Sequence, residues 1–307
     1  MIEFVNAKIN IGLQIVGKRT DGYHDLQTVF YPVGIKAGLP SNPEPFCDIL
    51  EVGEAEEDFA RVTENANESP ETVVVFEGTR FIFGGRKIDC PAEKNLVCKA
   101  ASLFFRETDK NPEDMTIRLY KSLPDGAGMG GGSADASFTL RALASYYGLE
   151  GLPLAEWALK LGADCPFFIY NRPMYAEGVG ECLEPIALDL SGKWLAVVKP
   201  DLYVSTKEAF AGVTPKEASF NLRSIAELPV EQWREVVTND FEQSLVPRHP
   251  ELAVTKGMLY RGGALYSAMT GSGSCVYGIF SDKAKAKNAL DEFAGLPTIE
   301  RTYLLEL

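Results

Sequence analysis

One glycine-rich stretch carries the clearest chemistry in this chain of 307 residues. Five glycines fall between Gly126 and Gly132, and Ser133 follows at once. Glycine reaches positive φ cheaply and has no Cβ, so neighbouring backbone N–H groups can converge on an anion. From Ser133 onward, apolar residues recur with the spacing of a one-sided helix. Because the free N–H groups and the positive dipole end of a helix face the same point, this stretch predicts a phosphate site.

The loop does not match the two commoner phosphate-binding patterns. A Walker loop ends in Gly-Lys-Ser/Thr, whereas the residue before Ser133 is Gly132. The segment from Gly126 to Gly131 fits G-x-G-x-x-G, but a dinucleotide site also needs a preceding strand and an acidic residue about twenty positions further on. A flexible turn is the structural alternative, because glycine often only separates elements.

Other residues that could do chemistry lie near the start of the chain. Lys8 and Asn10 share one face of an expected strand, where they either line a cleft or face water. Tyr23 and His24 end a turn-rich loop, and His24 is one of only two histidines.

A fourth candidate is Asp164, two residues before Pro166. This is also the position of a helix N-cap, so capping is its structural alternative. The neighbouring Cys165 has no histidine close to it in sequence, and packing explains it better than nucleophilic or redox chemistry.

The elements that must position these residues interleave strands and helices without an internal repeat, which predicts an α+β protein. Residues 34–70 predict an exposed, partly mobile excursion with acidic and loop-forming runs. The turn-like run at 175–181 predicts no strand. We expect strands at 2–16, 26–33, 48–52, 72–76, 115–120, 195–198 and 301–305, and helices at 96–105, from 133, at 154–161, from 204, at 230–237, 250–261 and 283–293.

Composition describes an ordinary soluble protein, with 46% hydrophobic and 24% charged residues. The net charge of −13 argues against a nucleic-acid surface but not against a nucleotide held by backbone amides. Six scattered cysteines without a C-x-x-C pair predict reduced thiols in the cytoplasm, and two histidines make a zinc site improbable. The start has no signal-peptide pattern and no apolar run approaches membrane length, so we expect no membrane partner.

Three separated stretches, in this order, resemble the GHMP kinases. They are Ala7-Lys8-Ile9-Asn10, the glycine loop from Pro124 to Ser133, and the segment from Met269 to Ser274. Further motifs narrow the resemblance to members of this family that act on a CDP-linked methylerythritol in the non-mevalonate route to isoprenoid precursors. These further motifs lie at 21–27, 161–167 and 176–181, and the likeness leaves residues of about 37–75 uncovered.

The resemblance implies a fold of two lobes. The N-terminal lobe, expected at residues 1–170, would be like ribosomal protein S5 domain 2 and would bind ATP. The C-terminal lobe, expected at 171–307, would be ferredoxin-like. A monomer or weak homodimer is expected.

The resemblance also implies the reaction, in which ATP phosphorylates the 2-hydroxyl of the methylerythritol unit. Asp164 matches the catalytic aspartate that accepts or steers the hydroxyl proton. Lys8 matches the lysine that holds this carboxylate ionised and offsets charge on the transferring group. Residues that match the ATP site are Asn95, Leu96, Pro124, Gly126, Ala127, Gly128, Met129, Gly130, Gly131, Gly132, Ser133, Gly271, Ser272 and Gly273.

For the acceptor, Tyr23 and His24 match residues that stack on cytosine and hydrogen-bond its edge. Phe210 is expected as the second face of that stack, and Asn10 as a contact of the methylerythritol portion, together with Asp164. Mg²⁺ is expected with ATP, held chiefly by phosphates and water, because no acidic cluster indicates a protein-built metal site.

Two alternatives stay open at this point: another small-molecule kinase of the family, of the homoserine or mevalonate type, or a non-catalytic nucleotide-binding regulator. The segment Gly22-Tyr23-His24 distinguishes a kinase of the CDP-linked substrate from the first alternative. The presence of both Lys8 and Asp164 argues against the second alternative. The chain departs from the family pattern in two places. Ser137 stands where a second alanine is usual, and residues 37–75 are longer and more acidic.

Overall fold

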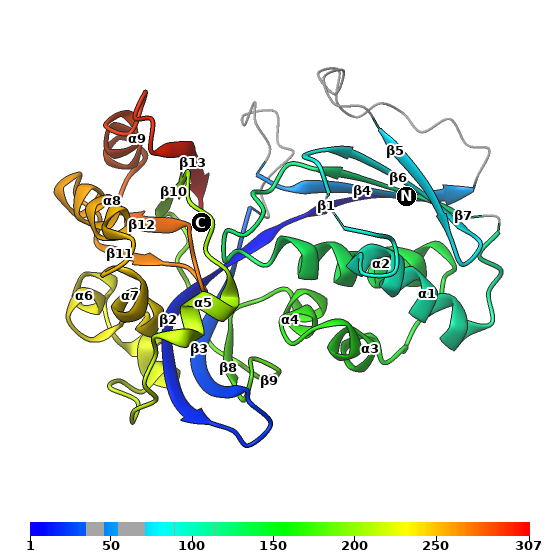
Figure 1. Ribbon diagram of the computed structural model, residues 1–307, viewed down its shortest axis with the longest axis horizontal. Coiled ribbons are helices and arrows are strands. Elements are labelled where there is room, and N and C mark those ends of the chain that lie inside the picture. The colour runs from blue at the N-terminus through cyan, green and yellow to red at the C-terminus, as the bar shows by residue number, and fades with distance from the viewer. Residues whose placement is uncertain (35–45, 55–70, 89, 114) are drawn as a thin grey trace. The chain divides into compact units, whose positions relative to one another are not determined.

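The computed structural model describes residues 1–34, 46–54, 71–88, 90–113 and 115–307. The chain divides by compactness into two units. Unit 1 comprises Met1–Ala7, Ile35–Leu123 and Gly131–Asn171, and unit 2 comprises Lys8–Gly34, Pro124–Gly130 and Arg172–Leu307. Because this division does not follow chain order, a single boundary between residues 170 and 171 stays a prediction. The mixture of helices and sheets confirms the α+β class (Figure 1).

Unit 1 contains a five-stranded sheet in the order β1-β4-β7-β6-β5. Among the strand pairs that the described residues form in this sheet, only β6 and β7 are parallel. In β7, Ile117 and Leu119 are buried while Arg118 and Tyr120 between and beside them are partly exposed, which is the pattern of a sheet with one covered face. The strands are β1 (Ile2–Val5), β4 (Asp48–Glu54), β5 (Thr72–Phe76), β6 (Thr79–Gly85) and β7 (Met115–Lys121).

Four helices of unit 1 gather on one side of this sheet (Figure 1). They are α1 (Leu96–Thr108), α2 (Gly131–Tyr146), α3 (Leu154–Leu161) and α4 (Cys165–Tyr170). Helix α2 packs against α1, α3, α4 and the strand β4, so it is the central element of the layer. Its buried face includes Ala134, Phe138 and Leu140.

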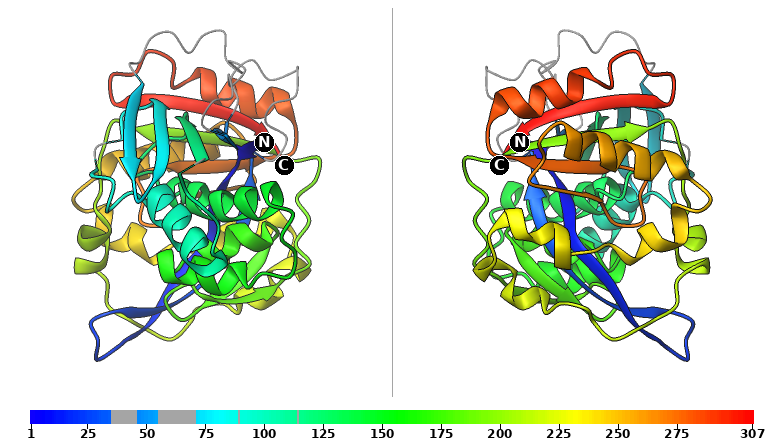
Figure 2. Two further views of the ribbon diagram at one scale, coloured as in Figure 1. Left: turned by 90° about the vertical axis from the view of Figure 1, so that its right-hand side faces the viewer. Right: turned by 90° about the vertical axis from the view of Figure 1, so that its left-hand side faces the viewer.

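Unit 2 contains two four-stranded sheets, in the orders β2-β3-β8-β9 and β11-β12-β10-β13. The second sheet is antiparallel throughout, and α8 and α9 pack on it (Figure 2). Its strands and these helices enclose an apolar cluster that includes Phe280 and Phe293. The strands of unit 2 are β2 (Ala7–Lys18), β3 (His24–Val33), β8 (Met174–Glu177), β9 (Cys182–Pro185), β10 (Trp194–Pro200), β11 (Tyr266–Met269), β12 (Val276–Phe280) and β13 (Ile299–Glu306).

The helices of unit 2 begin where capping residues occur in the sequence. Ser205 caps α5 and Asp282 caps α9, each through a side-chain oxygen that accepts a hydrogen bond from a backbone N–H of the first turn. Helix α8 begins with Pro250, whose fixed φ suits the first turn. The helices are α5 (Thr206–Ala211), α6 (Trp233–Val236), α7 (Asp240–Leu245), α8 (Pro250–Arg261) and α9 (Lys283–Asp291), with 3-10 turns at Leu222–Glu227 and Val230–Gln232.

Four expectations about local structure need correction. The expected strand at 2–16 is two strands that separate at Asn6. The run at 175–181 is not only a turn, because β8 occupies its first part and pairs with β3 and β9. The glycine-loop helix begins at Gly131, two residues before the expected Ser133. In the region 34–70, the strand β4 at Asp48–Glu54 is buried rather than exposed, while the expected mobile excursion at 35–45 and 55–70 lies outside the described residues.

Candidate active site

The early strand β2 buries the two polar residues that the sequence placed on one face. Lys8 and Asn10 are each 3% exposed, so the alternative that they face water is wrong. Lys8 Nζ donates a hydrogen bond to Asn10 Oδ1 at 2.6 Å and lies 4.7 Å from the centroid of the Phe30 ring. Asn10 Nδ2 donates in turn to Thr28 Oγ1 at 3.0 Å. The lysine is therefore buried within a polar chain, which holds its ammonium group in one place.

The glycine loop and the late segment lie against this strand within unit 2. Lys8 N donates to Met129 O at 3.0 Å, and Asn10 N donates to Thr270 Oγ1 at 3.0 Å. The Thr270 hydroxyl donates to Gly128 O at 3.1 Å, and so links the strand to the loop. Three motifs that are far apart in sequence are thereby joined by hydrogen bonds in one unit.

Positive φ values shape the glycine loop. Gly126, Gly128 and Gly130 have φ of +58°, +72° and +73°, in the region that favours glycine. Further backbone bonds hold the loop to the late segment, from Ser274 N to Gly126 O at 3.2 Å and from Cys275 N to Ala127 O at 3.4 Å. The loop is thus an ordered structure, and the alternative of a flexible turn does not hold.

Replacing Gly128 by alanine should disrupt this arrangement. A Cβ at this position would lie 2.0 Å from Thr270 O, a backbone atom that also accepts a bond from Gly273 N at 3.0 Å. Gly148 is the matched control, because it has φ +62° and nothing within 4 Å of its Cβ position. We expect Gly148→Ala to cost about 1–2 kcal/mol from φ strain alone. Gly128→Ala should cost clearly more, measured by urea unfolding, and should raise the KM for ATP. Equal costs for the two variants would contradict the close approach.

The N-terminal turn of α2 contains the last glycines of the motif. Gly131, Gly132 and Ser133 form this turn in unit 1, where helix N–H groups have no partner within the helix. The nearest atom to a Cβ placed on Gly132 is Leu96 Cδ1 at 3.9 Å, so the starts of α1 and α2 are neighbours. Asn95 is the N-cap of α1, and its Oδ1 accepts from Val97 N at 2.9 Å. The sequence analysis did not assign this capping role.

Asp164 occupies the N-cap position of α4 but does not cap it. Its backbone has φ −79° and ψ −16°, and its side chain makes no capping hydrogen bond. The structural alternative for Asp164 is therefore wrong. The adjacent Cys165 is fully buried, and burial raises the pKa of its thiol to about 11. A thiol with that pKa is protonated at neutral pH, in agreement with a packing role.

Ser137, the departure from the family pattern, connects α2 to the start of α4. Its Oγ lies 2.7 Å from Cys165 O and 2.9 Å from Ser133 O, and the hydroxyl donates to these carbonyls. An alanine could not make either bond. The serine therefore supports the backbone immediately after Asp164.

The residues expected to recognise the acceptor lie in unit 2. Tyr23 is 64% exposed in the turn between β2 and β3, and its backbone N–H donates to Asp21 Oδ1. The His24 ring stacks on the Phe210 ring with centroids 4.8 Å apart and planes at 20°. The structure thus brings His24 and Phe210 together, while their roles toward a substrate stay predictions.

A buried charge cluster in unit 1 was missed by the sequence analysis. Lys121 Nζ donates to Asp48 Oδ2 at 2.5 Å and to Asp135 Oδ2 at 2.8 Å, and all three side chains are almost completely buried. Asp48 Oδ1 accepts from Ser122 N at 2.6 Å and from Leu123 N at 2.8 Å. We call Asp48, Lys121 and Asp135 the buried triad.

The buried triad lies beside both ends of the glycine loop. Leu123, which precedes the loop, donates its backbone N–H to Asp48, and Lys121 Nζ lies 3.2 Å from the place that a Cβ on Gly131, near the end of the loop, would take. Burial and the nearby Asp48 carboxylate raise the pKa of Asp135 well above its usual range, against the opposing effect of Lys121.

A signal for two of these residues was present in the sequence. Lys121 is in phase with the buried residues Ile117 and Leu119 of β7, and Asp135 lies one turn before the buried Thr139 on α2. A charge in phase with an apolar stripe indicates a buried ion pair. Asp48 carried no comparable signal, because it is the first residue of its expected strand, in a region that was expected to be exposed.

Within the described ranges, no group of three or more His, Cys, Asp or Glu residues could hold a metal ion. A search of the same residues finds no helix that is long and apolar enough to cross a membrane.

Two family models match the chain. The GHMP kinases N terminal domain matches residues 95–172, and the GHMP kinases C terminal model matches residues 221–296. The first match contains Asn95, the glycine loop and Asp164. The second contains the late segment.

Similar proteins cover nearly the whole chain. A protein of Parabacteroides distasonis named 4-diphosphocytidyl-2-C-methyl-D-erythritol kinase is 44% identical over 282 residues, which is 91% of this chain and 92% of that protein. One of Porphyromonas gingivalis with the same name is 41% identical and covers 94% of this chain and 95% of its own.

Solved structures agree with these matches. A crystal structure of 4-(cytidine 5'-diphospho)-2C-methyl-D-erythritol kinase aligns with a TM-score of 0.75 at 29% identity, over 99% of this chain and 98% of that one. A homoserine kinase from Cytophaga hutchinsonii aligns with a TM-score of 0.65 at 14% identity, over 100% of this chain and 95% of that one, which is a likeness of fold alone. These matches confirm the fold expected from the motifs.

Proposed function

Because the chain belongs to the GHMP kinase family, we propose that it transfers the terminal phosphoryl group of ATP to the 2-hydroxyl of 4-diphosphocytidyl-2-C-methyl-D-erythritol. The products are the 2-phosphate and ADP. The observation that carries this proposal is the match to relatives of that name, at 40–44% identity over most of both chains. The motif residues that the reaction requires are all present in this chain.

ATP is the phosphoryl donor of this kinase family, and the glycine loop is its proposed binding element. Phosphoryl transfer asks a protein mainly to position the reactants and to stabilise charge. The positive φ values of Gly126, Gly128 and Gly130 turn successive backbone groups of the loop, and the free N–H groups of α2 follow. Asn95 and Leu96 are proposed for the adenine side, and Gly271, Ser272 and Gly273 for the phosphate side.

We assign the proton chemistry to Asp164 and the charge stabilisation to Lys8. Asp164 matches the catalytic aspartate of the family and does not cap α4, and we assign to it the role of accepting or steering the proton of the acceptor hydroxyl. Lys8 is fixed by Asn10, so its ammonium group needs little reorganisation during the reaction. Asn10, in the same polar chain, is proposed to contact the methylerythritol portion.

Mg²⁺ is proposed to accompany ATP. Phosphate oxygens and water are its usual ligands in such sites, so a dedicated group of carboxylates is unnecessary. When bound, Mg²⁺ would neutralise charge on the phosphates. A cytoplasmic location and a monomeric or weakly dimeric state stay predictions.

The decisive assay compares acceptors. Purified protein with Mg²⁺ and ATP should form ADP with the CDP-linked substrate, and not with homoserine or mevalonate. Turnover of homoserine or mevalonate instead would identify another kinase of the family. ATP binding without turnover of any acceptor would identify a nucleotide-binding regulator.

The residues proposed to bind cytosine provide a second test of the proposed function. Tyr23→Ala should raise the KM for the CDP-linked substrate about five- to hundredfold, because an aromatic ring stacked on a base contributes about 1–3 kcal/mol. His24→Ala should also raise it, through lost hydrogen bonding and lost stacking on Phe210. The KM for ATP is the internal control and should not change. Unchanged kinetics on the CDP-linked substrate in both variants would contradict the assigned substrate.

A further inference from the structure

The helix α5 carries Phe210 but is too short to hold its own position. It has six residues, from Thr206 to Ala211, and isolated helices of fewer than about 12 residues are marginal in water. At its start, Ser205 Oγ accepts a hydrogen bond from Glu208 N at 3.1 Å. The remaining stabilisation must come from the elements against which α5 packs.

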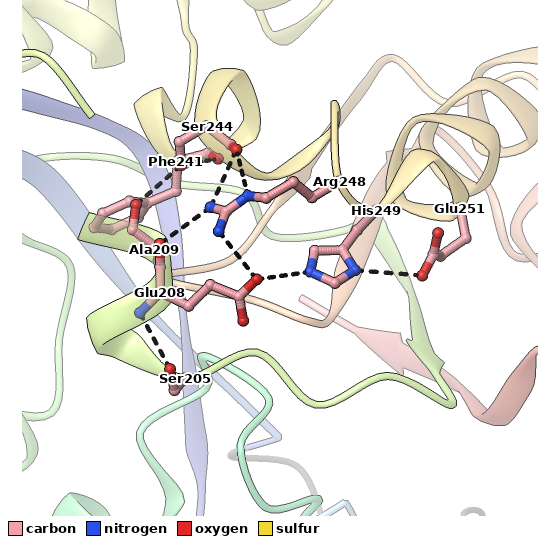
Figure 3. Close-up of polar contacts among 8 residues, drawn as sticks. All are labelled: Ser205, Glu208, Ala209, Phe241, Ser244, Arg248, His249 and Glu251. Atoms are coloured by element: carbon pink, nitrogen blue, oxygen red, sulfur yellow. Dashed lines mark hydrogen bonds and ion pairs between the residues drawn. The ribbon is translucent and has the colours of Figure 1, made fainter. Parts of the chain in front are cut away.

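The last carbonyls of α5 are satisfied by residues of α7 and of the turn that follows α7. Carbonyl groups in the final turn of a helix have no partner within the helix. Arg248 Nη2 donates to Glu208 O at 3.2 Å, and Ser244 Oγ lies 2.9 Å from Ala209 O and 3.0 Å from Phe241 O (Figure 3). Arg248 also donates to Ser244 O through Nε and Nη2, so one guanidinium joins α5 to the end of α7.

Charge reinforces these backbone bonds. Glu208 Oε1 lies 2.9 Å from His249 Nε2 and 3.3 Å from Arg248 Nη1 (Figure 3). The hydrogen bond with His249, together with the charge of Arg248, lowers the pKa of the Glu208 carboxyl. The Glu251 carboxylate lies 3.7 Å from the other nitrogen of His249, on the opposite side of the ring from Glu208 (Figure 3). We call Glu208, Ser244, Arg248 and His249 the α5 anchor.

The α5 anchor determines where the Phe210 ring lies. One face of this ring stacks on His24, and its contact with Phe241 of α7 is edge-on, with centroids 4.8 Å apart and planes at 87°. The packing is close, because a Cβ on Gly212 would lie 2.9 Å from Ser244 Cβ. A displacement of α5 from α7 would therefore separate Phe210 from both rings.

We propose that the α5 anchor consists of positioning residues for recognition of the nucleoside diphosphate part of the acceptor. By fixing α5, it holds Phe210 beside His24 before the substrate binds, and this preorganisation lowers the cost of binding. The anchor has no role toward ATP or the chemical step. This inference rests on the proposed function, because it assigns Phe210 and His24 to the acceptor.

The test measures acceptor and donor separately. Arg248→Met and Ser244→Ala should each raise the KM for the CDP-linked substrate, and the dissociation constant of CDP alone measured by titration calorimetry. We expect about a tenfold increase, the scale of one lost aromatic stacking contact. The values of kcat and of the KM for ATP should stay the same. Glu208→Gln alters one partly exposed carboxylate and tests the same contact in a variant that should fold normally.

Two further variants serve as the negative and the positive control of this test. Glu251→Gln removes a carboxylate that lies on the far side of His249 from Glu208, so it should leave CDP affinity unchanged. Phe210→Ala should weaken CDP binding at least as much as the anchor variants. If Phe210→Ala weakens CDP binding while the anchor variants do not, the anchor proposal is overturned and the proposed function stands. An anchor variant that lowers kcat or the affinity for ATP as much as it lowers the affinity for CDP also overturns the anchor proposal. If the wild-type protein does not phosphorylate the CDP-linked substrate, the proposed function fails, and the CDP titrations still decide the anchor.

Discussion

Replacing Asp164 by alanine should lower kcat by about 10²- to 10⁴-fold, the usual contribution of a positioned general base. ATP should still bind, because the glycine loop and the start of α2 keep their backbone groups. Asp164 makes no capping hydrogen bond to α4, so the substitution removes no helix cap. The measurements are steady-state turnover of the CDP-linked substrate, ATP titration and urea unfolding.

Asp282 is the matched control for Asp164, because it caps a helix and has no proposed role in the reaction. It is the N-cap of α9, and its side chain accepts a hydrogen bond from Lys285 N at 2.9 Å. Asp282→Ala should therefore cost about 1 kcal/mol of stability, the typical value of a lost cap, and leave turnover unchanged. Equal turnover of wild type and Asp164→Ala would disprove the role of Asp164. A large loss of stability in Asp164→Ala would instead restore its structural interpretation.

Lys121→Met should be among the most destabilising single changes in the chain. The substitution removes the only cation that contacts Asp48 and Asp135 among the described residues, and leaves two carboxylates buried together. Removing one partner from a buried ion pair typically costs about 3–5 kcal/mol. The midpoint of urea unfolding should fall accordingly. The KM for ATP should rise, because Asp48, which binds the backbone of Leu123 at the start of the glycine loop, loses its cationic partner.

Asp135→Asn is the matched control for this prediction. It removes one negative charge from a cluster that holds two carboxylates and one ammonium group, so Lys121 and Asp48 remain as a neutral pair. The cost should be much smaller than that of Lys121→Met. Similar costs for the two variants would show that packing, and not charge, governs the buried triad.

The pH dependence of stability gives an independent check on Asp135. Its pKa in the folded protein is raised by burial above that of an unfolded aspartate. At a pH between these two pKa values, the folded protein binds more protons than the unfolded protein. The contribution of Asp135 to stability is therefore present at low pH and is lost as the pH rises through the folded pKa. Asp135→Asn should remove this decrease. A steeper decrease in the variant would contradict the sign of the shift.

Local patterns predicted many elements well. The strand β5 and the helix α8 lie at the residues expected for them. The strand β8 was missed because it is short and gains its conformation from pairing with β3 and β9. Such pairing is a property of register between distant segments, and a single stretch of sequence does not contain it.

The motif residues could be identified from the sequence alone. The glycines from Gly126 to Gly132 indicated a phosphate site by their type and spacing. The roles of Lys8 and Asp164 were implied by the resemblance to the GHMP kinases, because each of these residues by itself also had a structural explanation. The comparisons confirm the family. No structural information was needed for that conclusion.

The support around those residues came only from the folded chain. The buried triad joins residues 48, 121 and 135, and the α5 anchor joins 208 to 244, 248 and 249. Each contact depends on how a strand or helix packs against another one, and a charged residue looks the same in sequence whether its partner is water or a buried ion. The chemical groups could be recognised one by one, whereas the interactions that hold them in place exist only between elements brought together by folding.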